Sequence, residues 1–170
     1  NLEGTVIVNG DDDKLATIHD VYGKAPITFG MNKDNAIWAD HIENRGLLGS
    51  RADIHMGDVL VHAHIPLPGE HMIYNAMAAA AVGVQFDMTK EEITAGISHV
   101  EAVAGRSHLI EAGDKVVIDD CYNANPVSMK AAIDLLAKAP GRKVDILGDL
   151  FELGENERAL HREVGQEEGG

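Results

Sequence analysis

The stretch VIDDCYNANPVSMKAA, residues 117–132, decides the fold. It begins with apolar residues typical of a buried strand and continues with the pattern of a helix. Asn125 is a preferred residue just before a helix, and Pro126 suits the first helical position because an N–H is not needed there. The sequence therefore predicts a strand over residues 115–119, followed directly by a helix over residues 126–139.

The same alternation is expected again downstream of this helix. Pro140 and Gly141 end the helix, residues 143–147 predict a second strand, and residues 157–166 predict a second helix. Two strands joined through a helix are expected to be parallel, with a right-handed crossover. We therefore predict the first βαβ unit of a Rossmann-like domain, which is too small to be a complete doubly wound domain.

Upstream, the pattern is mostly that of strands. Residues 5–9 and 26–29 predict two short strands, and residues 14–22 predict a helix between them. Residues 37–64 predict further strands with turns at Asn44-Arg45-Gly46 and Gly57-Asp58, the last of them extending over residues 59–67.

Two helices follow these strands. The first is expected over residues 70–82 with Gly83 as the glycine that ends it. The second is expected over residues 89–99, where Thr89 and Glu92 form a capping box.

A domain boundary is expected where the helical pattern stops. Residues 101–107 show no strong periodicity and contain Gly105. We therefore predict an α/β protein with one domain over residues 1–104 and another over residues 105–170.

Composition restricts the classes of partner. The formal net charge is −14, and no basic cluster is longer than Arg142-Lys143, so a nucleic-acid or anionic-membrane partner is not expected. No apolar run approaches the roughly 20 residues that span a bilayer. Cys121 is the single cysteine, which excludes internal disulfides and suits a reducing, cytoplasmic environment.

Polar residues follow the predicted strand at residues 115–119. Residues 119–126 hold two carboxylates and two amides beside the N-terminus of a helix, at the sheet edge where α/β proteins bind ligands. This composition suits a ribose, a phosphate or a ligand carboxylate. A well-capped turn without a ligand explains it equally well. Residues 148–154 follow the second predicted strand in the same way, with a weaker signal.

Other candidates are isolated side chains. His71 and Asn75 share one face of the helix expected over residues 70–82, and an Asn amide can recognise an adenine edge. His62 and His64 lie on one face of a strand, but no third metal ligand is close in sequence, so no metal site is predicted. Cys121 is a weak candidate for a nucleophile.

Several of these segments resemble the Mur ligase family. They are PLPGEHMIYNAMAAAAVG at residues 66–83, Gly105-Arg106, the stretch at residues 117–132, and LGDLFELGENERALHREVG at residues 147–165. VIVNGDDD and ITFG, at residues 6–13 and 27–30, resemble the central domain of the same family, although a proline is expected after the paired aspartates. The resemblance covers nearly the whole chain in order, and DDCYNANPVSM with LGD-x-x-ELGE is specific to one member.

The resemblance implies part of an ATP-dependent, amide-bond-forming ligase of peptidoglycan precursor synthesis. Residues 1–104 would be the C-terminal part of a P-loop-type central ATP-binding domain, and residues 105–170 the N-terminal part of the C-terminal domain. The implied cofactors are ATP and Mg²⁺, and the implied substrates are UDP-N-acetylmuramoyl-tripeptide and D-alanyl-D-alanine. In this family ATP phosphorylates a peptide carboxylate, and the incoming amine attacks the acyl phosphate.

Residue roles follow from the same resemblance. His71, Asn75, Arg106 and Asp120 match ATP-binding positions, and Asn123 and Asn125 match a loop that faces the incoming dipeptide. Asp149, Glu152 and His161 belong to the specific motif without an assigned role. No catalytic residue or metal ligand is expected within the chain, because it contains no G-x-x-x-x-G-K-[ST] motif. The isolated chain is therefore predicted to be inactive and, with an unpaired sheet edge, to self-associate.

Two alternatives remain open. One is another Mur or folylpolyglutamate-type ligase, against which the CYNANP block argues. The other is a non-catalytic nucleotide- or peptide-binding module, which the missing P-loop would suit.

Overall fold

The computed structural model describes residues 4–167. The chain divides into two compact units, Asn1–Val100 and Glu101–Gly170, which are described separately here as unit 1 and unit 2. The boundary predicted from the sequence, between residues 104 and 105, lies a few residues after the boundary between Val100 and Glu101. No helix among residues 4–167 has the length and apolar character needed to cross a bilayer.

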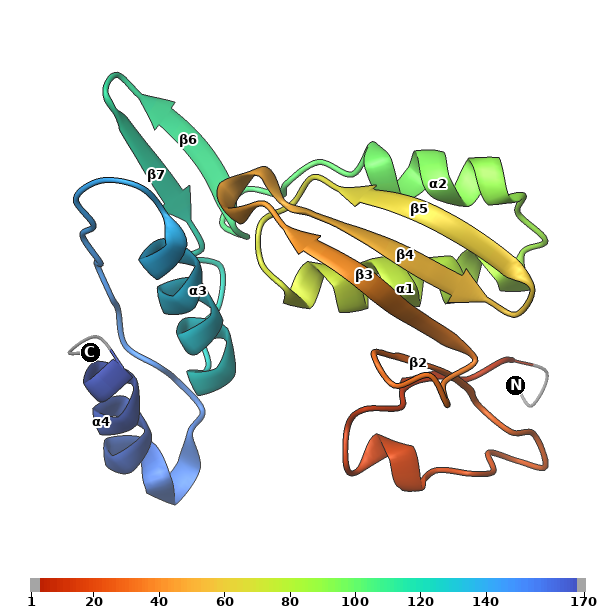
Figure 1. Cartoon of the computed structure of the whole chain (residues 1–170). Helices are drawn as coiled ribbons and strands as arrows, with labels where there is room; N and C mark the ends of the chain where they lie inside the picture. Colours follow the sequence, from red (N-terminus) through yellow and green to blue (C-terminus); the bar gives the residue numbers. More distant parts are fainter. Residues whose placement is uncertain (1–3, 168–170) are drawn as a thin grey trace. The chain divides into compact units, whose positions relative to one another are not determined.

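Unit 1 is built on a mixed five-stranded sheet with the order β1-β2-β3-β4-β5 (Figure 1). β1, β2 and β3 are parallel, whereas β3-β4 and β4-β5 are antiparallel pairs. The strands expected in this part of the chain are confirmed. Their bounds are Ile7–Asn9 (β1), Ile27–Gly30 (β2), Ile37–Asn44 (β3), Ser50–Met56 (β4) and Val59–Ile65 (β5).

The helix predicted over residues 14–22 is wrong. Only a 3₁₀ turn forms there, at Leu15–Thr17. The Asp12 carboxylate accepts hydrogen bonds from the N–H groups of Lys14 and Leu15, which favours a local turn. Further on, Tyr22 and Gly23 both have positive φ, at 54° and 81°, which ends any helix.

Two helices follow β5, and both were expected. α1 is His71–Gln85, and α2 is Lys90–Ser98 with the predicted capping box of Thr89 and Glu92. The expected helix end at Gly83 is wrong, because Gly83 lies inside α1. A Cβ atom at Gly83 would come within 2.9 Å of Ile93 Cγ1, so the glycine allows the two helices to approach closely.

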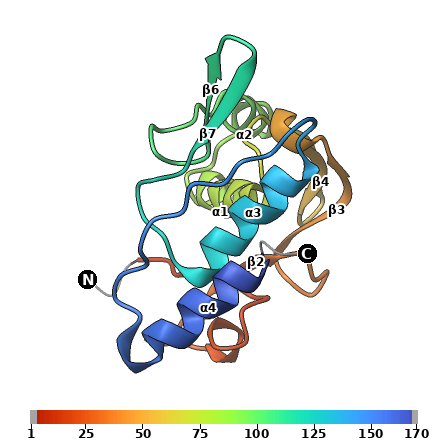
Figure 2. The same ribbon diagram turned by 90° about the vertical axis from the view of Figure 1, so that its left-hand side faces the viewer.

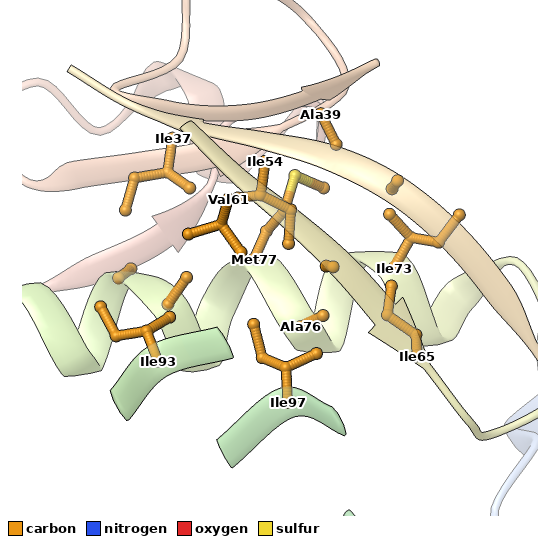
Figure 3. Close-up of a cluster of buried hydrophobic side chains, with 14 residues drawn as sticks. Ile37, Ala39, Ile54, Val61, Ile65, Ile73, Ala76, Met77, Ile93 and Ile97 are labelled. Carbon is orange, nitrogen blue, oxygen red and sulfur yellow. The ribbon is translucent and has the colours of Figure 1, made fainter. Parts of the chain in front are cut away.

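Alternate residues of the strands make an apolar layer with these helices. Figure 3 shows the side chains of Ile54 and Val61 next to Met77 of α1, with Ile93 of α2 close by. Ile54, Val61, Ile73, Met77 and Ala80 are fully buried. Burial of this one face of the sheet is the main stabilising contribution to unit 1.

Truncation of Met77 tests this layer. We expect Met77→Ala to lower the free energy of unfolding by about 2–5 kcal/mol, because it leaves a cavity beneath the sheet. Val82 lies on the same helix but is 46% exposed, so Val82→Ala should cost less than about 1 kcal/mol. Chemical denaturation of both variants measures the difference, and equal losses would contradict the placement of the core.

Unit 2 begins with an antiparallel hairpin, β6 (His108–Ala112) and β7 (Lys115–Asp119). β7 was expected and β6 was not. Ala112 pairs with Lys115, so the connection is the two-residue turn Gly113-Asp114, and Gly113 has a φ of 66°. A Gly-Asp pair between two apolar runs is a hairpin signal that was available in the sequence.

Two helices complete unit 2, and both confirm the sequence prediction. α3 is Pro126–Lys138, and α4 is Glu157–Glu167. They lie side by side in Figures 1 and 2. Between them, Leu150 contacts Ile133 of α3 and Val164 of α4 in a small buried cluster.

The strand predicted over residues 143–147 is wrong, and the parallel βαβ unit is therefore not formed. This segment has no regular secondary structure, and β7 pairs with β6 instead. Val144 and Ile146 are 65% and 94% exposed, so neither has an apolar surface to cover it among the described residues. An extended segment needs a neighbouring strand for its N–H and C=O groups, and no strand within residues 4–167 pairs with this one.

Candidate functional site

The N-terminal end of α1 presents two of the predicted site residues. His71 is the first residue of the helix and Asn75 follows one turn later, and both are exposed. Gly69 has a φ of 104°, and a Cβ atom there would lie 2.5 Å from His71 Cε1. The glycine therefore allows the imidazole to lie against the loop that leads into α1. Asn75 Nδ2 donates only to the weak acceptor Met72 Sδ, at 3.3 Å.

Asp11 holds this end of α1 against the sheet. Its carboxylate accepts hydrogen bonds from Tyr74 Oη of α1 at 3.1 Å and from Asn35 Nδ2 at 2.9 Å. It also accepts from the backbone N–H groups of Met31 and Asn32, just after β2. One carboxylate thus joins the loop after β1, the loop after β2 and the helix that carries His71 and Asn75. Asp11 lies in the VIVNGDDD segment that resembles the Mur ligase central domain, but no role was predicted for it from the sequence.

These contacts determine the protonation behaviour of Asp11. Partial burial alone would raise the pKa of Asp11, but the hydrogen bonds from Met31, Asn35, Asn32 and Tyr74 outweigh it and lower the pKa below its usual 3.8. The ionised form is therefore the one that the fold stabilises.

Replacement of Asp11 gives a prediction with a defined pH dependence. Because the pKa is lowered on folding, the contribution of Asp11 to stability is present above about pH 3.8 and is lost as the pH falls through the lower folded value. Asp11→Ala should cost about 1–2 kcal/mol at neutral pH, and this difference from the wild type should shrink towards pH 2.

Asp13→Ala is the matched control, since Asp13 is exposed in the same Asp11-Asp12-Asp13 run. Urea denaturation between pH 2 and pH 7 measures all three chains. A cost for Asp11→Ala that stays constant over this range would contradict the assignment.

In unit 2, two carboxylates join the segment before β6 to the segment that follows β7. They belong to Asp119, the last residue of β7, and to Asp120. Gly105 N–H donates to Asp119 Oδ2 at 3.0 Å, and Ser107 N–H donates to Asp120 Oδ1 at 2.7 Å. Gly105 has a φ of 76° and Ser107 a φ of 47°, so the backbone between them turns sharply around Arg106. Residues far apart in the sequence are thereby brought together.

Arg106 precedes the residue that is hydrogen-bonded to Asp120, and its guanidinium lies over an aromatic ring. The guanidinium carbon is 4.0 Å from the centroid of the Tyr122 ring, which is a cation–π contact. Tyr122 N–H in turn donates to Gly105 O at 3.0 Å. An exposed cation, an exposed carboxylate and an exposed aromatic ring therefore occupy one patch, which can contact the phosphate, hydroxyl and ring parts of a ligand.

Asn123 and Asn125 follow on the way into α3. Asn123 Oδ1 accepts from Ala124 N–H at 2.9 Å. Asn125 Oδ1 accepts from Ser128 N–H at 2.9 Å, and Ser128 Oγ accepts from Asn125 N–H at 3.0 Å. Asn125 is therefore the N-cap of α3, whatever contact it makes with a ligand.

The cap can be separated from a binding role by two substitutions. Asn125→Ala should cost about 1 kcal/mol because the N–H of Ser128 loses its acceptor, whereas Asn125→Ser should keep most of the stability. Thermal unfolding followed by circular dichroism measures both. Equal destabilisation by Ala and Ser would contradict the capping role.

Two further residues of unit 2 have structural contacts. His161 Nε2 accepts from Leu150 N–H at 3.1 Å, while His161 Nδ1 lies 2.9 Å from Glu157 O, so the ring fixes the loop before α4. A hydrogen bond with Asp119 raises the pKa of the Cys121 thiol. The thiol form is therefore favoured, and this opposes a role for Cys121 as a nucleophile.

Two family models match the chain. Residues 1–83 match the Mur ligase middle domain, and residues 105–168 match the Mur ligase glutamate ligase domain. The chain belongs to the Mur ligase family. Mur ligases are ATP-dependent enzymes that form amide bonds, and the resemblance stated from the sequence is confirmed.

Individual Mur ligases are similar over most of the chain. The UDP-N-acetylmuramoyl-tripeptide–D-alanyl-D-alanine ligase of Escherichia coli is 34% identical over 168 residues, which are 96% of this chain and 36% of that protein. The ligase of the same name from Bacillus subtilis is 41% identical over 104 residues, 59% of this chain and 23% of that protein. The chain thus spans between about a quarter and little more than a third of the length of the curated relatives it matches.

Solved structures agree in fold. A crystal structure of MurF from Acinetobacter baumannii has a TM-score of 0.86 at 31% identity, covering 96% of this chain and 36% of that one. MurF from Thermotoga maritima, solved in complex with ADP, has a TM-score of 0.80 at 23% identity, covering 95% and 37% respectively. The α/β class predicted from the sequence is confirmed.

The structure places the predicted site residues in two groups. His71 and Asn75 are together on α1 of unit 1, and Arg106, Asp120, Asn123 and Asn125 are in or beside the joined loops of unit 2. The roles assigned to them from the family remain predictions. Asp11 and Tyr122 support these groups and had been given no role, because their contacts are with residues remote in sequence.

Proposed function

We propose that this chain is part of a ligase that uses ATP to join D-alanyl-D-alanine to UDP-N-acetylmuramoyl-tripeptide in peptidoglycan precursor synthesis. The observation that carries the proposal is the 34% identity to the Escherichia coli ligase of that name over 96% of the chain. The CYNANP block at residues 121–126, which argued against other Mur ligases, lies within this match. In this mechanism ATP activates the tripeptide carboxylate as an acyl phosphate, and the amine of the dipeptide attacks it.

Each unit offers side chains that suit one part of ATP. Asn75 offers an exposed amide for an adenine edge and His71 an exposed ring beside it, whereas Asp120 offers a carboxylate for the ribose hydroxyls. Arg106, already oriented by Tyr122, offers a guanidinium to a phosphate. The triphosphate and Mg²⁺ would be held by residues outside this chain, since it has no P-loop motif.

The dipeptide is assigned to the loop before α3. Asn123 is exposed, and an amide can both donate to a carboxylate and accept from an amine. Asn125 is beside it at the N-terminus of α3, whose partial positive charge favours the carboxylate of D-alanyl-D-alanine.

A chimera tests the proposed reaction. The matching segment of the Escherichia coli ligase is replaced by this chain, and ligation is measured with D-alanyl-D-alanine and with single amino acids as competitors. We expect ATP-dependent addition of the dipeptide. A folded chimera that adds a single amino acid, or that binds ATP without any ligation, would overturn the proposal.

A second chimera with a shorter replaced segment is the test to use if the first chimera does not fold. Replacing only the region that corresponds to residues 105–167 keeps the whole central domain of the host enzyme. Since the specific motif lies in this region, the same selectivity for D-alanyl-D-alanine is expected.

Arg106 provides the sharpest residue test in the active chimera. Arg106→Ala should raise the KM for ATP by roughly 10–100-fold, because a charge-assisted hydrogen bond is worth about 1.5–3 kcal/mol. Arg106→Lys should recover little, because a lysine cannot keep the planar stacking on Tyr122. Arg142→Ala, at an exposed arginine of the same unit, is the control and should leave the KM unchanged.

The isolated chain is expected to differ from the complete ligase in activity and in association state. We expect it to show no ligase turnover and to self-associate, and sedimentation of a single monomeric species would contradict the second expectation.

A cytoplasmic location is proposed because the single, exposed Cys121 suits a reducing compartment.

A further inference from the structure

A cluster of histidines and aspartates lies on the strands β3, β4 and β5 of unit 1, outside the residues assigned to ATP. Asp40 and His41 are in β3, Asp53 is in β4, and His62 is in β5. Asp40 faces Asp53 directly in the antiparallel register, and Asp53 faces His62. Two carboxylates opposite each other on neighbouring strands repel, so a positive charge placed between them would be stabilised.

His41 reaches the two carboxylates because of a bulge. The register of β3 and β4 shifts between Asp40 and Glu43, so His41 and Ile42 face the single residue Ala52. His41 has a φ of 48°, a conformation that is uncommon for residues other than glycine. Consecutive residues of a regular strand point to opposite faces, whereas this bulge brings His41 to the same face as Asp40.

The distances are those of a metal site. His41 Nδ1 lies 3.1 Å from Asp40 Oδ1 and 3.1 Å from Asp53 Oδ2, and one ligand atom from each of the three residues lies within 4.8 Å of the others. Zinc bonds of about 2.0–2.2 Å in tetrahedral geometry place neighbouring ligand atoms about 3.3–3.6 Å apart. The spacing of His41 Nδ1 from each carboxylate is therefore close to that of a bound ion.

Both carboxylates are already oriented by further histidines. His55 Nε2 lies 2.9 Å from Asp40 Oδ1, and the His55 ring is stacked on Trp38 with 3.6 Å between centroids. His62 Nδ1 lies 2.6 Å from Asp53 Oδ1. Histidine–carboxylate pairs of this kind hold metal ligands in place in known sites.

The cluster is accessible from solvent. The side chains of Asp40 and Asp53 are 26% and 23% exposed, whereas that of His41 is 78% exposed. A hollow of about 360 Å³ lies over the strands, and its lining includes His41, Asp53 and His62. Lys33 Nζ lies 3.9 Å from Asp40 Oδ2 and its side chain is 72% exposed, so it compensates the two carboxylates only weakly.

We propose that Asp40, His41 and Asp53 bind a divalent first-row transition-metal ion of the zinc class, with the fourth position open to solvent. His41 binds through Nδ1, so the proton on that nitrogen moves to Nε2 or to solvent when the ion enters. Imidazole with two carboxylates selects zinc-class ions over Mg²⁺, which prefers oxygen ligands alone. His62 and His55 act as positioning residues through the two carboxylates.

Calorimetric titration of the chain with Zn²⁺ tests the proposal. We expect one ion per chain in the wild type and no comparable heat with Mg²⁺. His41→Gly removes the nitrogen ligand and relieves the positive φ, which offsets part of the stability lost with the contacts of His41, so the variant should remain folded. Loss of a positioning histidine, as in His62→Ala, should lower the zinc affinity by about 10–100-fold. The zinc affinity of His41→Gly should fall by more than this.

A control and a second readout make the result decisive. His19→Ala removes an exposed histidine of the same unit and should leave zinc binding unchanged. Substitution of Co²⁺ should give the visible absorption of a four-coordinate ion in the wild type and in His19→Ala but not in His41→Gly. Absence of zinc binding, binding that survives His41→Gly, or equal binding of Mg²⁺ would each overturn the proposal.

Discussion

The packing of α1 against one face of the mixed sheet is the constraint on which unit 1 depends. Ala76, Ala80 and Ala81 are small, so the helix comes close to the strands, and Met77 fills the space beneath Ile54. The other side of the same helix carries His71 and Asn75. The apolar layer therefore fixes the orientation of the residues proposed to meet the nucleotide.

Carboxylates that accept backbone N–H groups position the polar parts of both units. In unit 1, Asp11 joins two loops and α1. In unit 2, Asp119 and Asp120 hold the turn around Arg106. Each arrangement replaces regular secondary structure by charge-assisted hydrogen bonds, which are among the stronger polar contacts in a protein. The proposed ligand-binding side chains thus lie on a helix in unit 1 and on loops in unit 2, and carboxylates hold both in place.

Local patterns in the sequence predicted most of the elements that form. The alternation in residues 59–65, the cap at Asn125 and the capping box at Thr89 each depend on neighbours in the chain, and each is found as expected. The strand over residues 143–147 was predicted wrongly because a strand requires a partner, which local pattern does not reveal.

The site was only partly predictable for the same reason. The shared face of His71 and Asn75 follows from helical spacing. The contacts of Arg106 with Tyr122 and of His41 with Asp53 depend on a turn and on a bulge, which bring together residues remote in sequence. Their chemistry could be recognised only once the backbone path was known.

Native-state hydrogen exchange tests most directly the claim that α1 and the sheet form one cooperative layer. The account predicts that the slowest amides of α1, β4 and β5 exchange with one common free energy, and that Met77→Ala lowers it equally for all three by about 2–5 kcal/mol. Exchange of the α1 amides at a much lower free energy than those of β4, in wild type or variant, would contradict it.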